Sequence, residues 1–224
     1  MKLELRKTAD GSNTLYVPDL DEHYHSFHGA FQEAKHVFIK NGLLNQDKKE
    51  LRILEVGFGT GLNALLTACE SERFGYNIDY VGIEAYPVSS EIMAKMDYAT
   101  LFEDSNAALF FEEIIHSKWS KPSFIHPKFQ LTKIEERIEE TVCDKKIDLI
   151  YFDAFGPRVQ KEIWDISILK KMNSFLNFNG ELVTYCAKGQ FKRDLKSAGF
   201  EVFSLDGPPG KREMVRARKN KSVF

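Results

Sequence analysis

The first part of the chain alternates apolar and polar residues, whereas the remainder has short apolar runs separated by segments with helical periodicity. Around Asp10 and Gly11 the alternation has a period of two on both sides of a turn, which predicts a β-hairpin. In the next segment, 28–42, apolar residues recur at helical spacing, and Gly42 is expected to cap this helix. We therefore expect residues 1–45 to form an extension that precedes the main sheet.

From residue 46 onward, the pattern predicts strands and helices in turn. The expected strands, each a short apolar or alternating run, cover 51–56, 77–85, 128–134, 147–152, 180–187, 200–205 and 212–219. The expected helices cover 61–73, 106–119, 161–176 and 190–199, with one more that has Pro87 in its first turn.

Such an alternation specifies an α/β fold with a doubly wound, mainly parallel sheet. The last two strands differ, because the short segment DGPPGK joins them and short loops connect antiparallel strands. A parallel sheet with a C-terminal antiparallel hairpin is the Rossmann-like architecture of class I S-adenosylmethionine-dependent methyltransferases. We expect a single domain over residues 1–224, in which 46–224 form this core.

Three glycines stand between the first core strand and its helix, in LEVGFGTGLN. Glycine lets the main chain approach a ligand closely, so Gly57, Gly59 and Gly61 predict a ligand at this turn. Their G-x-G-x-G spacing departs from the G-x-G-x-x-G of dinucleotide-binding proteins. Glu84 ends the next strand, where a carboxylate can accept hydrogen bonds from ribose hydroxyls. With the terminal hairpin, this spacing favours a methyltransferase over a dehydrogenase.

An aspartate follows the strand 147–152, in KIDLIYFDAFGP. In open α/β sheets, ligands bind at the carboxyl ends of the strands, so Asp153 is expected to face both cofactor and substrate. A carboxylate there can orient an amine, accept its proton and favour the positive charge of a methyl donor. Alternatively, Asp153 only caps the turn that follows the strand, and one residue can have both roles. Phe155 would add an apolar wall and Pro157 would stiffen the loop.

Composition and charge narrow the class of protein. With 43% apolar and 29% charged residues, the chain has an ordinary globular composition, and no run approaches the ~18 apolar residues of a membrane span. The first residues have no signal-peptide pattern, so we expect a cytoplasmic protein. From Lys188 onward there are ten Lys and Arg residues against four Asp and Glu residues, a formal charge of +6. Because the whole chain has a formal charge of −2, the preceding residues carry −8. A basic C-terminal part suggests a phosphate-bearing partner, although it is also compatible with a solvated surface.

Several motifs together resemble one family. VGFGTGLN, DAFGP followed by Trp164, GPPGKREM and the segment DEHYHSFHGAFQEAKHVFI are similar to the methyltransferase domain of MnmC, the bifunctional enzyme of wobble-uridine modification in bacterial tRNA. The resemblance covers nearly the whole chain. It implies a stand-alone, MnmD-like enzyme that uses S-adenosyl-L-methionine to methylate the amine of 5-aminomethyl-(2-thio)uridine at the wobble position. It also implies no FAD and no oxidoreductase domain, so the substrate would arrive with a free aminomethyl group.

The resemblance also assigns roles by position. It places Gly57, Gly59, Gly61 and Glu84 at the cofactor, and Asp153, Phe155 and Pro157 in the methyl-transfer loop. Tyr24 and Glu33 are further candidates for closing the cofactor pocket; both lie in DEHYHSFHGAFQEAKHVFI, residues 21–39, which we call the entry segment. Lys133 stands where the family has an acid for the adenine, so the backbone or Thr132 is expected to make that contact.

The basic residues and histidines complete the list of candidates. We expect tRNA, at its anticodon region, to meet Lys188, Lys192, Arg193, Lys211 and Arg212. A splayed base would stack on Phe155 or Trp164, although helical spacing favours Trp164 as a core residue. His23, His25 and His28 lack the acid or cysteine that would complete a metal site, so no metal is expected.

Two alternatives stay open: a methyltransferase for a small amine, and a nucleotide-binding module of the same fold without catalysis. The sequence predicts neither a membrane contact nor a particular oligomeric state.

Overall fold

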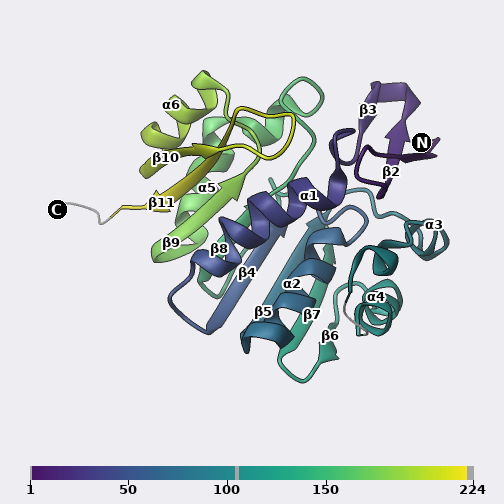
Figure 1. Ribbon diagram of the computed structural model, residues 1–224. Helices are drawn as coiled ribbons and strands as arrows, with labels where there is room; N and C mark the ends of the chain where they lie inside the picture. The colour runs from purple at the N-terminus through teal and green to yellow at the C-terminus, as the bar shows by residue number, and fades with distance from the viewer. Residues whose placement is uncertain (1, 104–105, 221–224) are drawn as a thin grey trace.

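A computed structural model describes residues 2–103 and 106–220 (Figure 1). Its centre is an eight-stranded sheet with the strand order β10-β11-β9-β8-β4-β5-β7-β6. The five strands from β9 to β7 run parallel, and β11 is antiparallel to both β9 and β10. The strands are β4 Glu50–Val56, β5 Asn77–Glu84, β6 Pro122–His126, β7 Phe129–Glu135, β8 Ile147–Phe152, β9 Leu176–Thr184, β10 Phe200–Asp206 and β11 Glu213–Lys219.

Helices cover both faces of this sheet, each over its own apolar core (Figure 1). One core holds residues of α2 and α4 together with the helical segment of the extension, and the other holds residues of α5 and α6. The helices are α2 Leu62–Phe74, α3 Ser90–Ala94, α4 Ala107–His116, α5 Ile166–Phe175 and α6 Gly189–Ser197. The doubly wound, mainly parallel α/β fold is thus confirmed. Within the described ranges, no helix is long and apolar enough to cross a bilayer.

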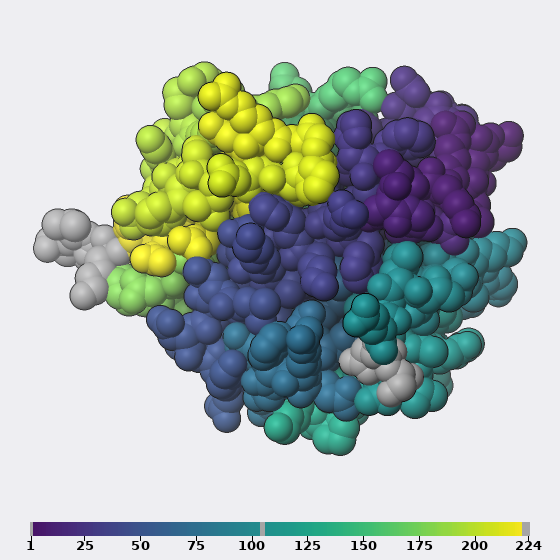
Figure 2. Space-filling model, viewed as in Figure 1, coloured from purple at the N-terminus to yellow at the C-terminus, as the bar shows by residue number. Residues whose placement is uncertain are grey.

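The N-terminal extension begins with the predicted hairpin. Strands β1 Glu4–Lys7 and β2 Asn13–Val17 pair antiparallel, and β3 Glu22–His23 adds a third strand to this small sheet. The chain then enters α1 Ala30–Ala34, which continues as a π-helix over Lys35–Lys40. This segment lies against the loop between β10 and β11, so the N-terminal extension and the last pair of strands meet on one face (Figures 1 and 2).

Gly42 does not cap the helix as expected. Its φ of −106° lies outside the left-handed region. The helix ends instead with a π-type turn, in which the Asn41 N–H donates to the His36 carbonyl at 3.3 Å. A Cβ at Gly42 would lie 2.3 Å from the Phe38 carbonyl oxygen, so glycine is needed here for a close backbone approach.

Three other sequence predictions need correction. Pro87 precedes α3, which begins only at Ser90. The helix expected over 161–176 is interrupted at Asp165, whose carboxylate caps α5 by accepting from the Ser167 N–H at 2.8 Å. The edge strand β6 was not expected, because its alternation is weak and it starts at a proline.

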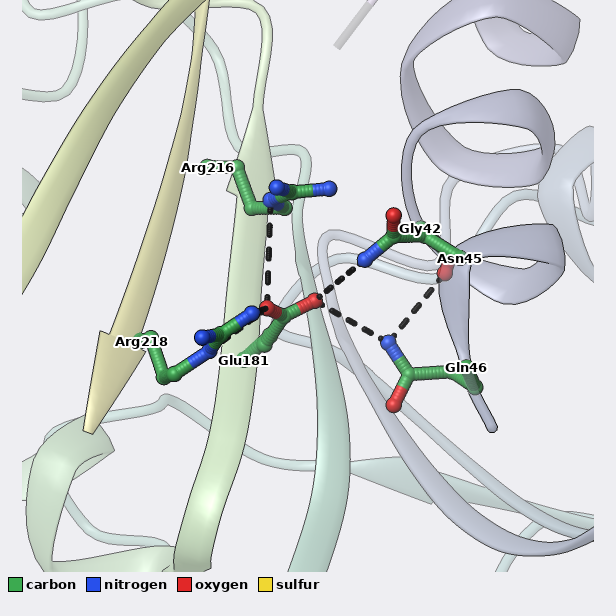
Figure 3. Close-up of polar contacts among 6 residues, drawn as sticks. All are labelled: Gly42, Asn45, Gln46, Glu181, Arg216 and Arg218. Atoms are coloured by element: carbon green, nitrogen blue, oxygen red, sulfur yellow. Dashed lines mark hydrogen bonds and ion pairs between the residues drawn. The ribbon is translucent and has the colours of Figure 1, made fainter. Parts of the chain in front are cut away.

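A buried carboxylate joins the extension to the C-terminal strands (Figure 3). Glu181 on β9 accepts two hydrogen bonds from the Arg218 guanidinium on β11, at 3.0 and 2.8 Å. Its other oxygen accepts from the side-chain amides of Asn45 and Gln46, each at 3.1 Å. Breaking a buried group of this kind is costly, because a charge is left without its partner. The network therefore anchors the extension on the sheet that it covers.

Candidate functional site

A cavity of about 520 Å³ opens at the carboxyl ends of the central strands. Its walls come from the residues that follow β4, β5, β7 and β8, and from the entry segment of the extension. We call it the cofactor cavity. Its lining residues are Leu20, Tyr24, His25, Val56, Gly57, Phe58, Gly59, Leu62, Asn63, Ile83, Glu84, Ala85, Tyr86, Glu136, Ile138, Asp153, Ala154, Phe155, Gln160 and Ile163.

The glycine turn lies at this cavity, but its three glycines serve different purposes. Gly57 has a φ of +89°, and a Cβ there would lie 2.6 Å from the Asp153 carbonyl oxygen. Gly59 also has a positive φ, +53°, and the ring of Tyr24 covers it. Gly61 begins α2 and faces Met93 on the other side, so it does not line the cavity. Two of the three predicted glycines therefore stand at the cavity, and the third shapes the turn.

Glu84 is held in place by backbone groups. Its two oxygens accept from the N–H groups of Gly59 and Tyr86, each at 3.0 Å. Burial raises the pKa of Glu84, although these hydrogen bonds oppose the shift. Tyr24 lines the same cavity, and burial, followed by the charge of Glu84, raises the pKa of its phenol. Both residues thus lie where the sequence predicted a ribose contact and a closing side chain.

The acid after β7 is Glu136, which the sequence prediction missed. Glu136 lines the cavity, and its N–H donates to the Glu84 carbonyl at 3.1 Å. Lys133 is 2% exposed and points away, with its ammonium 3.0 Å from the Ile114 carbonyl oxygen, and burial lowers its pKa to about 8. Thr132 lies within β7, beside Val81 of β5, and does not line the cavity. In this region the cavity therefore offers Glu136, and not Thr132, to a ligand.

Asp153 stands at the end of β8 with one side-chain partner. Its Oδ2 accepts from the Asn63 amide at 2.7 Å. The same amide nitrogen donates to Glu55 at 2.8 Å, and the Tyr80 hydroxyl donates to the other Glu55 oxygen at 2.8 Å. Burial raises the pKa of Asp153 to about 8; the Asn63 hydrogen bond opposes this shift, the charge of Glu33 adds to it, and Lys211 opposes it.

Hydrogen bonds hold the loop after Asp153 in shape. The Phe155 N–H donates to the Gln160 side chain at 3.1 Å, and the Trp164 indole donates to the Phe155 carbonyl at 2.8 Å. The Phe155 ring meets Tyr24 edge-on, with ring centroids 5.0 Å apart. Trp164 is buried, which confirms the core interpretation, while Pro157 lines neither this cavity nor the one described next. Phe155 is therefore a wall residue, and Pro157 acts only through the loop.

A second cavity, of about 370 Å³, lies on the other side of Asp153. We call it the substrate cavity. It shares Tyr24, His25, Asp153, Ala154 and Phe155 with the cofactor cavity. Its remaining lining residues are Glu22, His23, Ser26, Phe27, Ala30, Glu33, Ala34, Phe38, Gly156, Tyr185 and Lys211. Asp153 thus belongs to the wall that the two cavities have in common.

Glu33 lines this second cavity and not the first, which corrects its assignment to the cofactor. Its Oε2 lies 2.6 Å from the Lys211 ammonium, which is also 3.9 Å above the centre of the Tyr185 ring. The Tyr185 hydroxyl in turn donates to the Ala154 carbonyl at 2.8 Å. Lys211 is therefore a residue of the substrate cavity, and the sequence alone had placed it among the tRNA contacts.

The other predicted tRNA contacts differ in exposure and in their hydrogen bonds. Lys188, Arg193 and Arg212 are exposed. Lys192 donates to Ser204 at 2.8 Å and forms an ion pair with Glu213. The Arg193 guanidinium also donates to the Gln190 side chain, at 3.2 and 2.8 Å, so it must change partners to meet a phosphate.

The histidines of the entry segment do not form a metal site. His25 is half-buried, and its backbone N–H donates to the Thr14 hydroxyl at 3.2 Å. Burial lowers the His25 pKa to about 4. Across residues 2–103 and 106–220, no group of three or more His, Cys, Asp or Glu residues could hold a metal ion.

Known proteins resemble this chain in both sequence and structure. Residues 119–220 match the family model described as S-adenosyl-L-methionine-dependent methyltransferase. The MnmC bifunctional proteins of tRNA 5-methylaminomethyl-2-thiouridine biosynthesis from Cupriavidus metallidurans and Paraburkholderia xenovorans are 30% and 27% identical over 92% of the chain. The chain spans about a third of their length, 32% and 34%.

Solved structures show the same fold. MNMC2 from Aquifex aeolicus superposes with a TM-score of 0.75 at 24% identity, covering 98% of this chain and 71% of that one. A methyltransferase from Pyrococcus furiosus gives a TM-score of 0.53 at 18% identity, covering 91% of each chain. The class I methyltransferase fold predicted from the sequence is thereby confirmed. The sequence matches confirm the resemblance carried by the motifs: the chain is similar to the MnmC proteins over about a third of their length.

Proposed function

We propose that this protein transfers a methyl group from S-adenosyl-L-methionine to the amine of 5-aminomethyl-(2-thio)uridine at the wobble position of tRNA. The observation that carries the proposal is the position of Asp153, in the wall shared by two adjoining cavities. One carboxylate there can face a methyl donor on one side and an amine on the other. The names of the MnmC relatives supply the tRNA substrate, which for this chain is part of the proposal.

The residues of the cofactor cavity fit S-adenosyl-L-methionine. Gly57 and Gly59 let the turn at the cavity wall pack closely against Asp153 and Tyr24, and Glu84 offers a carboxylate to ribose hydroxyls. Ile138 and Glu136 present an apolar surface and an acid, which suit an adenine ring and its amino group. When bound, S-adenosyl-L-methionine supplies a methyl group on a sulfonium. We propose these contacts without a role for FAD or a metal.

The side chain of Asp153 would prepare the amine for reaction. An alkylammonium cannot attack, because its nitrogen lone pair holds a proton. With its pKa raised to about 8, the ionised form of Asp153 is a strong enough base to take this proton, and this form predominates above about pH 8. The neutral nitrogen then forms a bond to the methyl carbon as the bond from carbon to sulfur breaks. The positive charge passes from sulfur to the methylated amine, so charge is balanced throughout.

The tRNA would approach the substrate cavity with its wobble base turned outward. Phe155 and Tyr185, which line this cavity, offer rings on which a base can stack. Lys188, Arg193 and Arg212 are exposed and can meet backbone phosphates. Because tRNA is the substrate that we propose, we also propose a cytoplasmic location. We further propose that residues 1–224 form a single domain.

The proposal is tested with labelled S-adenosyl-L-methionine and bulk tRNA from cells that lack this activity. We expect label in 5-methylaminomethyl-(2-thio)uridine after digestion to nucleosides. Label found only in small amines would replace the tRNA by another substrate, and cofactor binding without any transfer would indicate a non-catalytic module. Neutralising Lys188, Arg193 and Arg212 together is expected to weaken tRNA binding and to reduce its salt dependence.

Asp153→Asn tests the mechanism. Without the carboxylate, the amine loses both its orienting group and its proton acceptor, so we expect the transfer rate to fall by ~100-fold or more. Cofactor affinity, measured by calorimetry, should stay within a few-fold. Asp144→Asn is the matched control, because Asp144 is an exposed aspartate outside both cavities. An unchanged rate in the Asp153 variant would reject the role given to this residue.

A further inference from the structure

Asp153 is not the only acidic residue that lines the substrate cavity. Glu33 projects into it from α1, and Glu22 stands at its rim. Glu22 already pairs with Arg158 at 3.2 Å, on the surface. Glu33 is 8% exposed and pairs with Lys211, the one lysine or arginine among the described residues that line this cavity. The inner part of the cavity thus contains two carboxyl groups, those of Glu33 and Asp153, and a single ammonium.

The two members of the Glu33–Lys211 pair differ in their freedom to move. Lys211 belongs to the tight loop between β10 and β11, where its N–H donates to the Pro208 carbonyl at 2.9 Å. Its side chain is 30% exposed, so the ammonium can turn into solvent, whereas the Glu33 side chain is 11% exposed and lies on a packed helix. If the lysine leaves, Glu33 keeps a buried negative charge that needs another cation.

A protonated aminomethyl group is a cation of the right kind. Like the lysine side chain, it ends in an ammonium on a flexible carbon, with three N–H donors. The Lys211 ammonium also lies over the Tyr185 ring, so the position suits a cation with an aromatic surface beside it. Asp153 lines the same cavity as Glu33 and Lys211, so the three side chains lie near one another.

We propose that Glu33 determines specificity for the substrate amine, and that the aminomethyl ammonium takes the place beside Glu33 that the Lys211 ammonium holds in this structure. The proposal rests on the proposed function and deepens it. The amine first binds as a cation at Glu33, and its proton then passes to the Asp153 carboxylate. Glu33 therefore acts before the chemical step, by selecting tRNA whose wobble uridine carries an amine.

Selection by a buried carboxylate has a direct chemical consequence. A uridine without an amine leaves Glu33 with Lys211 and gains no ionic contact. An amine that carries its own carboxylate brings a second negative charge next to Glu33, which costs free energy because like charges repel in a cavity with little water. The site therefore favours the free aminomethyl group over both.

The test is Glu33→Gln, which keeps the size of the side chain and removes its charge. We expect KM for tRNA bearing 5-aminomethyluridine to rise by about 10- to 100-fold, the worth of one hydrogen bond to a charged group, with kcat within a few-fold. Binding of the same tRNA with an unmodified wobble uridine should stay unchanged. Glu113→Gln is the matched control, since Glu113 is an exposed glutamate of α4 outside both cavities, and neither value should change.

Other outcomes would overturn the assignment. An unchanged KM, or an equal loss of affinity for both tRNAs, means that Glu33 only supports the fold. Glu33→Asp adds a second check, because it restores a carboxylate and should recover part of the preference for the aminomethyl tRNA even if both variants are less stable. The wild-type reaction distinguishes the two proposals. If the wild type transfers no methyl group to aminomethyl tRNA, the proposed function is rejected. If the wild type is active and Glu33→Gln has the same KM, only the role of Glu33 is rejected.

Discussion

The two cavities are assembled in different ways. Most of the cofactor cavity comes from residues that directly follow four parallel strands, so each wall is the end of a strand or the turn after it. The substrate cavity is built from segments far apart in the sequence: residues 22–38 of the entry segment, the loop after β8, and the turn between β10 and β11. Only the Asp153–Phe155 stretch and the Tyr24–His25 pair belong to both.

This difference also appears in the forces that hold each cavity together. In the cofactor cavity, backbone N–H groups fix Glu84, and the backbone follows from the sheet. In the substrate cavity, side chains bridge separate elements, as Lys211 does to Glu33 and Arg158 to Glu22. We therefore expect backbone changes to damage the cofactor cavity most, and charge changes to act mainly on the substrate cavity.

The largest expected effect comes from Gly57→Ala. Gly57 has a φ of +89°, a conformation that is strained for a residue with a Cβ. The added Cβ would also lie 2.6 Å from the Asp153 carbonyl oxygen, so the turn or the end of β8 must shift. We expect affinity for S-adenosyl-L-methionine to fall by ~100-fold or more, measured by calorimetry, together with a lower melting temperature.

Gly75→Ala separates the clash from the cost of the backbone conformation. Gly75 caps α2 with a φ of +72°, and its added Cβ would meet no atom within 4 Å. This control should lose about 1 kcal/mol of stability and no cofactor affinity. If both variants bind the cofactor as the wild type does, a close approach at Gly57 is unimportant for the cavity.

A second prediction concerns stability and pH at the shared wall. The pKa of Asp153 is raised from 3.8 to about 8. Between these values the folded protein holds a proton that the unfolded chain has lost, so this residue lowers stability progressively as the pH rises. Asp153→Asn removes the effect, and its free energy of unfolding in urea should exceed the wild-type value by about 1 kcal/mol or more at pH 8, with no gain near pH 4.

Asp148, on the same strand, gives the opposite sign. Burial acts to raise its pKa, but hydrogen bonds from the Arg52 N–H, Lys48 and Asn177 outweigh it, so the pKa is lowered. Its stabilising contribution is present above pH 3.8 and lost as the pH falls through the lowered pKa, so Asp148→Asn should be destabilising at pH 8. Equal pH slopes for the two variants would show that the difference in environment has no effect on stability.

Local patterns predicted the parts of the fold that depend on neighbouring residues. The first hairpin, the glycine turn and the alternating core were all expected, because each follows from periodicity or from turn chemistry. The interruption at Asp165 had a local signal as well, an aspartate two residues before a serine, which the longer apolar pattern outweighed. The position of β11 between β9 and β10 depends on pairing across the whole chain, and no local signal specifies it.

The same limit applies to the site. Asp153 and Glu84 were selected because one follows a strand and the other ends one, at the carboxyl edge of the sheet. Glu33 was placed at the wrong cavity because its neighbour Lys211 is distant in the sequence and joins it only in the fold. Asn63 was not identified at all, since an asparagine in an apolar helix has no sequence feature that reveals a hydrogen bond to Asp153.

The smallest expected effect tests the position of the acid after β7. The sequence placed the adenine contact at Thr132, whereas Glu136, beyond the end of the strand, lines the cofactor cavity. Glu136→Gln should weaken S-adenosyl-L-methionine binding by about 3- to 10-fold, because a charged acceptor is replaced by a neutral one. Thr132→Val keeps the shape of its side chain and should leave this affinity unchanged. The reverse ranking, measured by calorimetry on both variants, would restore the contact expected from the sequence and would mean that the cofactor reaches deeper along β7 than the cavity extends.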